Sequence, residues 1–496
     1  EANDRGNDIL RVDASQLQAR VIGEGGNLGL TQPGRIEFAL HGGRIFTDAI
    51  DNSAGVDCSD HEVNIKILLG SLVTDERMTG RQRDELLRSM TDDVAARVLR
   101  TNYEQNVLLS NARHLGSRML GSHERLMAWL EQHRGLDREL EALPSTAELE
   151  RRTKEGRGLT SPEFSVLVAY AKMALKDALL ASTVPDDPWF ETELAEYFPE
   201  PLRGFTDALL GHPLRREIIA NRVANSVVNR GGITFAHRAL EESGAGLAEI
   251  AKAFVIAREA FDLHGFVTSV EDLDGVIPTR RQCELYVEFR RLLDRTVRYL
   301  LARRPQAADI GTEVSRYRDT VQRLSASMET LYDETGLARF RERAQTHVDG
   351  GIPEPLAARV AGLLDSIALL GVVDLAEQID ATPELIARGY LHMAEVIRLD
   401  DLLDMLARLS SEARWDAVAK AALRQDVYRL ALELTADALV LDENEDAAER
   451  VTRWSERHGD ALAALHATFG DLRDGTAAGL GQMWVLVRDL GLLADG

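Results

Sequence analysis

The chain has 496 residues, of which 45% are hydrophobic and 28% charged, as in a globular protein with enough apolar material for several cores. Its 58 basic and 81 acidic residues leave a formal charge of −23, which repels phosphate backbones and excludes broad nucleic-acid binding. No apolar run approaches the roughly 18 residues of a membrane-spanning helix, and the polar first residues lack the apolar core of a signal peptide.

The first 70 residues or so alternate short apolar runs with loops rich in glycine and asparagine. The runs "ARVIGEGGN" (19–27) and "GRIFTDAID" (43–51) predict two strands. Between them, "TQPGRIEFALHGG" (31–43) predicts a helix, because Pro33 stands at its start and glycines stand at its end. This alternation predicts part of a parallel α/β sheet.

The glycine-rich stretch "GEGGNLG" (23–29) is close to the dinucleotide fingerprint G-x-G-x-x-G but does not fit it. The sixth position of the pattern is Leu28, and the next glycine comes one place late. Two interpretations remain. The stretch is either a tight turn or a strand end that opens onto a ligand crevice, where Asn27 would offer an amide donor and acceptor.

Reactive side chains crowd the next stretch, "IDNSAGVDCSDHEVN" (50–64), which leads into an apolar run. Its "SDHE" segment matches the capping box S-x-x-E, so Ser59 would cap a helix and Glu62 would reach back to it. Capping does not exclude a binding role, because a helix N-terminus also attracts anions such as carboxylates.

Two further interpretations use the same stretch. Cys58 and His61 have the spacing of half a metal site, but no second Cys/His pair lies nearby and Cys283 is remote, so we expect no bound metal. Ser59 with His61 suggests a hydrolase, but no G-x-S-x-G elbow exists. The two distant cysteines give no disulfide framework, which favours a reducing cytoplasm.

From about residue 65 to the C-terminus the pattern is helical. Apolar residues recur three and four positions apart, and most segments follow a Thr, Ser, Asp or His-Pro start signal. We therefore expect a mainly α protein, in which an N-terminal α/β segment precedes a large all-helical region. The clearest helical segments are 90–113, 123–133, 161–182 and 212–230. The expected domains are 1–72, 73–346 and 347–496, and the longest turn-rich breaks are 142–158, 182–190 and 347–355.

The segment "HPLRREIIANRVANSVVNRGG" (212–232) predicts a helix with a buried face and an amide face. Its apolar face carries Ile218, Ile219, Val223 and Val227. Asn221, Asn225 and Asn229 recur every four residues on another face. Such a ladder is more typical of a contact between helices than of a ligand site.

Two of these stretches resemble one family. Residues 21–67, "VIGEGGNLGLTQPGRIEFALHGGRIFTDAIDNSAGVDCSDHEVNIKI", resemble the last part of the dinucleotide-binding domain of the large bacterial NAD-specific glutamate dehydrogenases. Residues 212–232 resemble the helical C-terminal region of the same family. The resemblance implies the end of a Rossmann-like NAD-binding domain over residues 1–72, followed by an all-helical region.

The N-terminal stretch is also similar, more distantly, to smaller glutamate dehydrogenases, which have an E-G-A-N loop and then N-A-G-G-V with a serine three residues later. By this resemblance, Glu24, Gly25, Asn27 and Asn52 would bind NAD, with the two asparagines near the nicotinamide and its ribose. Ser59 would bind a substrate carboxylate from the start of its helix.

Some positions depart from the family pattern. Gly26 and Ser53 exchange one small residue for another, whereas Phe46 stands where the large enzymes have asparagine in "GGRINTD", which leaves its role open. Lys66 lies within a helix and is interpreted as a structural or surface lysine. The family's catalytic lysines and aspartate should precede residue 1, so we expect no catalytic residue here and expect the chain to be a piece of a longer protein.

The resemblance implies an enzyme of amino-acid catabolism that oxidises L-glutamate to 2-oxoglutarate and ammonia by hydride transfer to NAD. Its partners would be these substrates, the remainder of the same polypeptide and further copies in a homo-oligomer, without nucleic acid or membrane, in the cytoplasm. The rival hypothesis is a non-catalytic helical module for oligomerisation or regulation of a larger enzyme.

Overall fold

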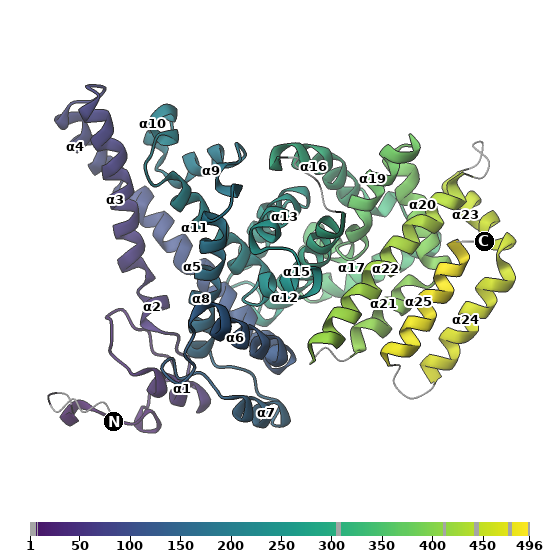
Figure 1. Ribbon diagram of the computed structural model, residues 1–496, viewed down its shortest axis with the longest axis horizontal. Helices are drawn as coiled ribbons and strands as arrows, with labels where there is room; N and C mark the ends of the chain where they lie inside the picture. Colours follow the sequence, from purple (N-terminus) through teal and green to yellow (C-terminus); the bar gives the residue numbers. More distant parts are fainter. Residues whose placement is uncertain are drawn as a thin grey trace. The chain divides into compact units, whose positions relative to one another are not determined.

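The protein is mainly helical (Figure 1). A computed structural model describes residues 6, 8–303, 309–409, 413–440, 446–474 and 479–494. It confirms helices at the four segments where the apolar periodicity is clearest. No strand forms among the described residues. Instead, the extended backbone at Val21 and at Arg44 forms an isolated parallel bridge.

The chain divides into two compact units, Glu1–His237 and Arg238–Gly496. The division falls inside helix α12, Phe235–Ser243. The predicted break at 347–355 forms the turn between α17 and α18 within the second unit. The domain boundaries expected after residues 72 and 346 stay predictions.

The first unit packs around long helices, with α3 on α5 and α8 on α11. Its helices are α1 Gln32–Leu40, α2 Asp48–Asp51, α3 Ser53–Thr74, α4 Gly80–Ser89, α5 Thr91–Leu115, α6 Leu120–Arg134, α7 Thr146–Lys154, α8 Ser161–Leu180, α9 Phe190–Tyr197, α10 Thr206–Leu210 and α11 Arg215–Ser226. The short helical turns are η1 Asp8–Leu10, η2 Ala14–Gln16, η3 Gly116–Met119, η4 Val184–Asp186, η5 Glu200–Leu202 and the π-helical turn η6 Val227–Gly231.

The second unit is built around α22, which packs on α20 and α25. Gly371 lets α19 approach α22, because a Cβ atom there would lie 2.3 Å from a Leu432 methyl group. Its helices are α13 Leu247–Ala260, α14 Leu263–Glu271, α15 Thr279–Arg303, α16 Ile310–Ala326, α17 Glu334–Asp349, α18 Glu354–Ala361, α19 Leu369–Ile379, α20 Pro383–Val396, α21 Leu399–Arg408, α22 Arg414–Leu439, α23 Ala447–Arg457, α24 Gly459–Asp474 and α25 Leu480–Ala494, with short turns η7 Met328–Thr330 and η8 Asp365–Ala368.

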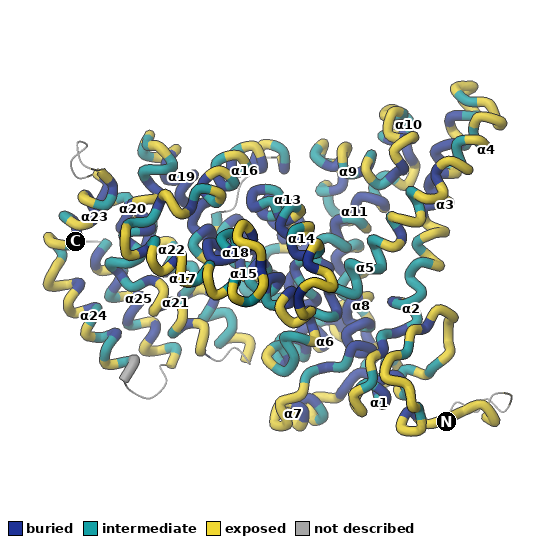
Figure 2. The backbone as a smooth tube through the Cα atoms, turned by 180° about the vertical axis from the view of Figure 1, so that it is seen from behind, coloured by how far each residue is buried: buried dark blue, intermediate teal, exposed yellow. Residues whose placement is uncertain are grey.

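Helices bury one stripe and expose the other, as the apolar periodicity predicts (Figure 2). On α3 the buried stripe carries Ile65, Leu68, Leu69 and Leu72, each at most 3% exposed. Burying one such side chain contributes roughly 1.5–3 kcal/mol. These stripes make the core of the first unit.

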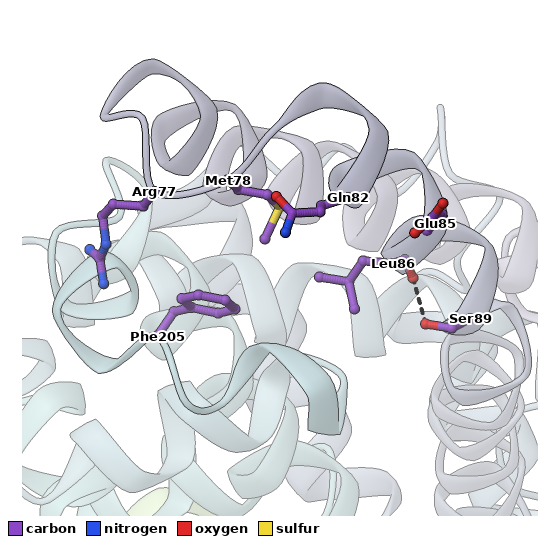
Figure 3. A pocket seen from close by; sticks show the side chains of 7 residues that line it. All are labelled: Arg77, Met78, Gln82, Glu85, Leu86, Ser89 and Phe205. Atoms are coloured by element: carbon purple, nitrogen blue, oxygen red, sulfur yellow. Dashed lines mark hydrogen bonds between the residues drawn. The ribbon is translucent and has the colours of Figure 1, made fainter.

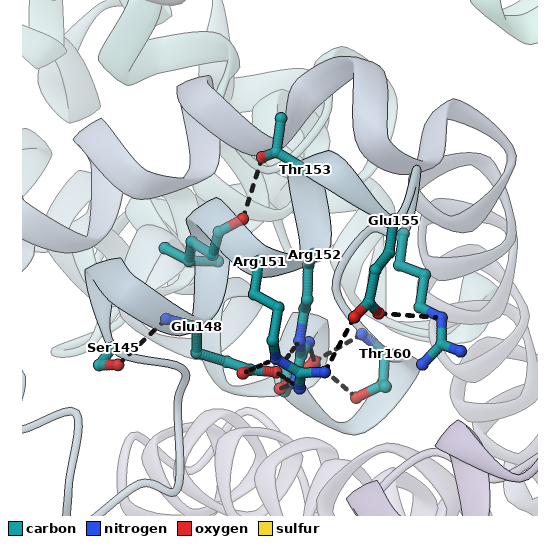
Figure 4. Close-up of polar contacts among 10 residues, drawn as sticks. Ser145, Glu148, Arg151, Arg152, Thr153, Glu155 and Thr160 are labelled. Carbon is teal, nitrogen blue, oxygen red and sulfur yellow. Dashed lines mark hydrogen bonds and ion pairs between the residues drawn. The ribbon is translucent and has the colours of Figure 1, made fainter.

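The predicted turn-rich break at 142–158 contains a helix, α7. Glu163, at the third position of α8, accepts hydrogen bonds from the Thr160 amide at 2.6 Å and the Thr160 hydroxyl at 2.8 Å. Arg152 of α7 donates to both carboxylate oxygens of Glu163, at 2.8 and 2.9 Å, and to Glu148 at 2.8 Å (Figure 4 shows the α7 side of this network). Ion pairs within α7 and from α7 to α8 therefore stabilise a segment whose proline and glycines indicate turns.

The helix predicted over 31–43 is confirmed as α1. Thr31 caps it by accepting a hydrogen bond from the Gly34 amide at 3.2 Å, and the chain leaves it through Gly42 at a φ of 92°. The two predicted strands beside it do not form a ladder. Only the Ile22 and Arg44 amides pair across, donating to the carbonyls of Arg44 and Arg20 at 2.9 and 3.0 Å.

The two segments form no ladder because the second one turns into a helix and its side chains bind the loop that follows the first one. The second predicted strand, 43–51, ends as α2, and its aspartates accept hydrogen bonds from the loop that follows the first strand. Parallel strands normally need neighbours and helical cover on both faces. Val21 has the bridge to Arg44 as its only strand-like pairing within the described residues, and its 66% exposure shows that it lacks such cover there.

Within the described residues, no single helix is long and apolar enough to span a bilayer. The bent pair Glu354–Ala361 and Asp365–Ile379, with a 58° angle between its parts, passes that test of length and composition only when taken together.

Candidate functional site

The loop between the bridge residue Val21 and α1 is tied down at both ends and open in the middle. The Glu24 amide donates to Asp51 Oδ2 at 2.9 Å, and the Leu28 amide donates to Asp48 Oδ2 at 3.0 Å. The bond from Leu28 lowers the pKa of Asp48, whereas burial raises the pKa of Asp51. The intervening Gly25, Gly26 and Asn27 are exposed, which leaves a stretch of accessible backbone.

Glu24 itself points away from solvent and is 4% exposed. Its carboxylate receives two hydrogen bonds from Arg35 of α1, at 2.6 Å from Nε and 2.8 Å from Nη2. Arg35 Nη2 also lies 3.2 Å from Asp48 Oδ1, and the hydrogen bond to Glu24 is the main reason that the pKa of Arg35 is raised. A bidentate pair of this kind fixes geometry as well as charge. Glu24 therefore holds the loop against α1.

The structure brings two of the predicted site residues together. Asn52 Nδ2 donates to Asn27 Oδ1 at 3.0 Å, on the exposed side of the loop. Asn52 stands at the start of α3, and a Cβ atom at Gly55 would lie 2.8 Å from Asn52 Oδ1. Glycine at position 55 thus gives the Asn52 amide room to face Asn27.

Asn102 of α5 anchors this junction and is not predicted from the sequence. Its Nδ2 atom donates to the Ile50 carbonyl at 2.8 Å and to Ser53 Oγ at 3.0 Å, on either side of Asn52. Asn106, one turn further along α5, donates to the Asn102 side chain at 3.0 Å and orients it. About fifty residues separate the partners in sequence, so no local pattern could have indicated the contact.

The predicted capping box at Ser59 is wrong. α3 begins at Ser53, so Ser59 lies in its second turn, where its hydroxyl donates to the Gly55 carbonyl at 3.3 Å. Glu62 forms an ion pair with the exposed Lys66. Ser59 follows Asn52 by seven residues, which places both on one side of the helix. Ser59 is exposed there, between the exposed side chains of Val56 and Val63.

The opposite side of α3 is structural. His61 is buried and stacks on Tyr197 with ring centroids 4.5 Å apart, and burial lowers its pKa to about 4. Asn64 Nδ2 donates to the Tyr197 hydroxyl at 2.8 Å. Cys58, by contrast, is exposed. Among the described residues, no group of three or more His, Cys, Asp or Glu side chains is placed to hold a metal ion.

The asparagine ladder predicted over 212–232 is right in part. Ile218, Ile219, Val223 and Val227 are buried as predicted. Asn229 lies in the π-helical turn η6, and its Nδ2 atom reaches Glu104 of α5 at 3.5 Å. Asn221 is exposed and has no such contact among the described residues.

A surface cavity of the first unit lies elsewhere, at the far end of α3. It is lined by Arg77, Met78, Gln82, Glu85, Leu86, Ser89 and Phe205 (Figure 3). None of the predicted site residues lines it. The loop 24–28 and the start of α3 instead form an open surface.

Comparison with known sequences matches both parts of the chain to one family. The model described as bacterial NAD-glutamate dehydrogenase, catalytic domain, matches residues 1–112. The model described as glutamate dehydrogenase, C-terminal, matches residues 156–491.

Three curated relatives are named NAD-specific glutamate dehydrogenase, and each is 38% identical to the chain. The proteins of Halomonas elongata and Pseudomonas aeruginosa align with 100% of the chain, and that of Mycobacterium tuberculosis with 99%. The chain spans 31%, 31% and 30% of their respective lengths. The chain therefore belongs to the bacterial NAD-specific glutamate dehydrogenase family.

Proposed function

We propose that the chain is part of an enzyme that oxidises L-glutamate with NAD. The carbon–hydrogen bond at Cα would lose a hydride to NAD and the amine would become an imine, which water then hydrolyses to 2-oxoglutarate and ammonia. The observation that carries this proposal is the family match through both the N-terminal and the helical parts. The catalytic lysines and aspartate would come from residues outside this chain.

Within that enzyme, we assign the open loop and the start of α3 to the cofactor. Gly25 carries no side chain. Apart from its two chain neighbours, no atom of the described residues lies within 4 Å of the position that a Cβ atom would take, so a ligand could approach its backbone closely. The bonded pair of Asn27 and Asn52 keeps amide groups available for the nicotinamide and its ribose. NAD would supply the hydride acceptor, and these residues would orient it.

The parallel bridge between Val21 and Arg44 supports the finer fold assignment. A parallel pair that flanks a helix is the minimal βαβ arrangement. We infer that residues 1–72 form the end of a Rossmann-like NAD-binding domain, whose sheet the rest of the polypeptide completes. The helical residues would then form the regions 73–346 and 347–496.

Ser59 is assigned to a carboxylate of glutamate, with one change from the sequence-based hypothesis. Because Ser59 lies in the second turn of α3, the helix N-terminus does not supply the attraction. The exposed hydroxyl would instead act by exchanging its bond to the Gly55 carbonyl for one to the substrate.

Ser59→Ala tests this assignment in the full-length enzyme. Loss of a hydrogen bond to a charged group should cost about 1.5–3 kcal/mol, which should appear as a higher KM for glutamate and a smaller change in the KM for NAD. Ser71→Ala is the matched control, because Ser71 is also exposed on α3 and donates to a backbone carbonyl, that of Leu68. Equal changes in both KM values, or the same changes in Ser71→Ala, would remove Ser59 from the substrate site.

A second role, in assembly, is favoured by the surface of the second unit. Trp415 is 72% exposed at the start of α22, and Trp484 is 57% exposed on α25. Large exposed aromatic side chains are enriched where proteins bind one another. We infer that this unit also contributes to a homo-oligomer.

The molar mass of the chain in solution tests that role. We expect a mass that is a multiple of the 54.8 kDa chain, and expect Trp484→Glu to lower it towards that of the monomer. Trp454→Phe, a change in a buried tryptophan, should leave the mass unchanged. A monomeric wild-type chain would contradict the assembly role.

We also propose that the enzyme is cytoplasmic. Neither Cys58 nor Cys283 forms a disulfide within the part of the chain that the structure describes, which fits a reducing compartment. The formal charge of −23 argues against nucleic acid and anionic membrane surfaces as partners.

A further inference from the structure

Arginine side chains outnumber carboxylates where α15 and α22 meet in the second unit. Arg298 of α15 is buried and pairs with two acids, Glu242 through Nε and Asp294 at 3.0 Å through Nη1. Arg238 pairs with the same Asp294 at 2.7 Å. The charges of these two arginines are therefore balanced by those of the two carboxylates.

Two further arginines, one on each helix, lie in the same place. Among the described residues, neither Arg295 of α15 nor Arg424 of α22 forms an ion pair. Arg295 Nη1 donates to the Tyr428 hydroxyl at 2.9 Å. Arg424 makes no hydrogen bond to any residue that the structure describes. Burial lowers the pKa of Arg424, the charge of Arg295 lowers it further, and the charge of Asp294 offsets these effects only in part.

Contacts between α15 and α22 keep the two arginines in one region of the second unit. Arg424 and Tyr428 are four residues apart, so they lie on the same stripe of α22. Gln425 donates from that helix to the Arg298 carbonyl at 3.2 Å, which joins α22 to α15. One turn before Arg424, Lys420 donates to the carbonyls of Ala407 and Leu409 at 2.8 and 2.7 Å, so it adds a cation and no acid.

This excess of positive charge is unexpected in a chain whose formal charge is −23. Two like charges that are partly buried and repel one another cost free energy unless an anion neutralises them. The forked donors of arginine match the oxygen atoms of phosphate and carboxylate groups. Arg238 and Arg298 are balanced by two acids. The charge of Asp365 also acts on Tyr428, but Asp365 is paired with Arg343 at 2.6 Å. The remaining charge is that of two arginines, which suits a dianion.

We propose that Arg295, Arg424 and the Tyr428 hydroxyl form a binding site for a small dianionic ligand carrying a phosphate group or two carboxylates. The site lies wholly in the second unit and does not depend on the assignment of the loop 24–28 and α3 to NAD and glutamate. Ligand binding there would join α15 to α22 and stabilise the helical unit.

Calorimetric titration of the 496-residue chain at low ionic strength tests this site. Inorganic phosphate and succinate are the two probes, and we expect at least one to bind with one ligand per chain. Arg424→Gln should weaken that binding by about tenfold or more, because a charge-assisted contact is lost. It should not lower the melting temperature without ligand, because it removes a repulsion.

Arg429→Gln is the matched control, since Arg429 is exposed on the same helix and pairs with Asp426 and Glu433. It should bind the probe like the wild type. If Arg424→Gln does not fold, Arg295→Gln provides the same test. Preference for phosphate or for succinate identifies the ligand group. Binding of neither probe by the wild type, or unchanged binding by the folded arginine variants, overturns the proposal.

Discussion

His61 illustrates how surroundings decide the chemistry of a side chain. In the sequence it stands beside Cys58 and Ser59, as a metal ligand or a catalytic base would. In the structure it is buried against Tyr197, and its Nδ1 atom has no hydrogen-bond partner among the described residues. A buried imidazole resists protonation, so its effect should appear in stability as a function of pH.

The pKa of His61 is about 4 in the folded chain and about 6.5 when it is unfolded. Below pH 6.5 the unfolded chain therefore binds a proton that the folded chain does not. The contribution of His61 to stability should fall as the pH drops from about 6.5 to about 4, by up to about 3 kcal/mol, and should be constant above that window. His61→Phe keeps the ring stacking and should flatten this dependence, measured by urea unfolding followed through hydrogen exchange of α3.

His133→Phe provides the control, because His133 also stacks on an aromatic ring, Trp129, but is exposed on α6. It should retain the wild-type loss of stability between pH 6.5 and 4. An equally steep pH dependence in wild type and His61→Phe would show that His61 contributes nothing to acid sensitivity.

At the scale of elements, the sequence predicts helices well and their starts less well. The periodicity of α5, α8 and α11 is long and regular, so packing and propensity agree. α3 starts six residues before the matched capping box, because tertiary contacts from Asn102 decide where the chain turns. For the same reason the sequence could indicate Asn27 and Asn52 but not Arg35, Asp48 or Asp51, which hold the loop in place.

The first turn of α3 contains a glycine that can separate fold from function. Gly55→Ala would place a Cβ atom 2.8 Å from Asn52 Oδ1 and displace that amide from Asn27. The end of a side chain can move, so the helix should still form. In the full-length enzyme we expect a KM for NAD raised by about tenfold, the equivalent of about one hydrogen bond.

Gly70→Ala is the control on the same helix, since no atom of the described residues outside the adjoining helix backbone lies within 4 Å of a Cβ there. It should stabilise α3 by up to about 1 kcal/mol and leave the KM for NAD unchanged. A normal KM for NAD in Gly55→Ala would argue against the assigned role of Asn52.

At the scale of the whole molecule, the division into units depends on contacts that the sequence does not display. Turn-rich segments lie at 182–190 and 347–355, whereas the two compact units divide within α12. Glycines and prolines mark where the chain turns, whereas a unit is defined by which helices share a core. Side-chain pairs such as Arg295 with Tyr428 join segments more than a hundred residues apart.

Separate cores predict separate responses to mutation. Leu69 of α3 and Leu434 of α22 are both 0% exposed, one in each unit. Replacing either by alanine leaves a cavity and should cost about 2–5 kcal/mol. Hydrogen exchange followed by mass spectrometry should show faster exchange in α3, α5 and α8 for Leu69→Ala, and in α20, α22 and α25 for Leu434→Ala. Faster exchange throughout both units in either variant would mean that the chain unfolds as one cooperative body.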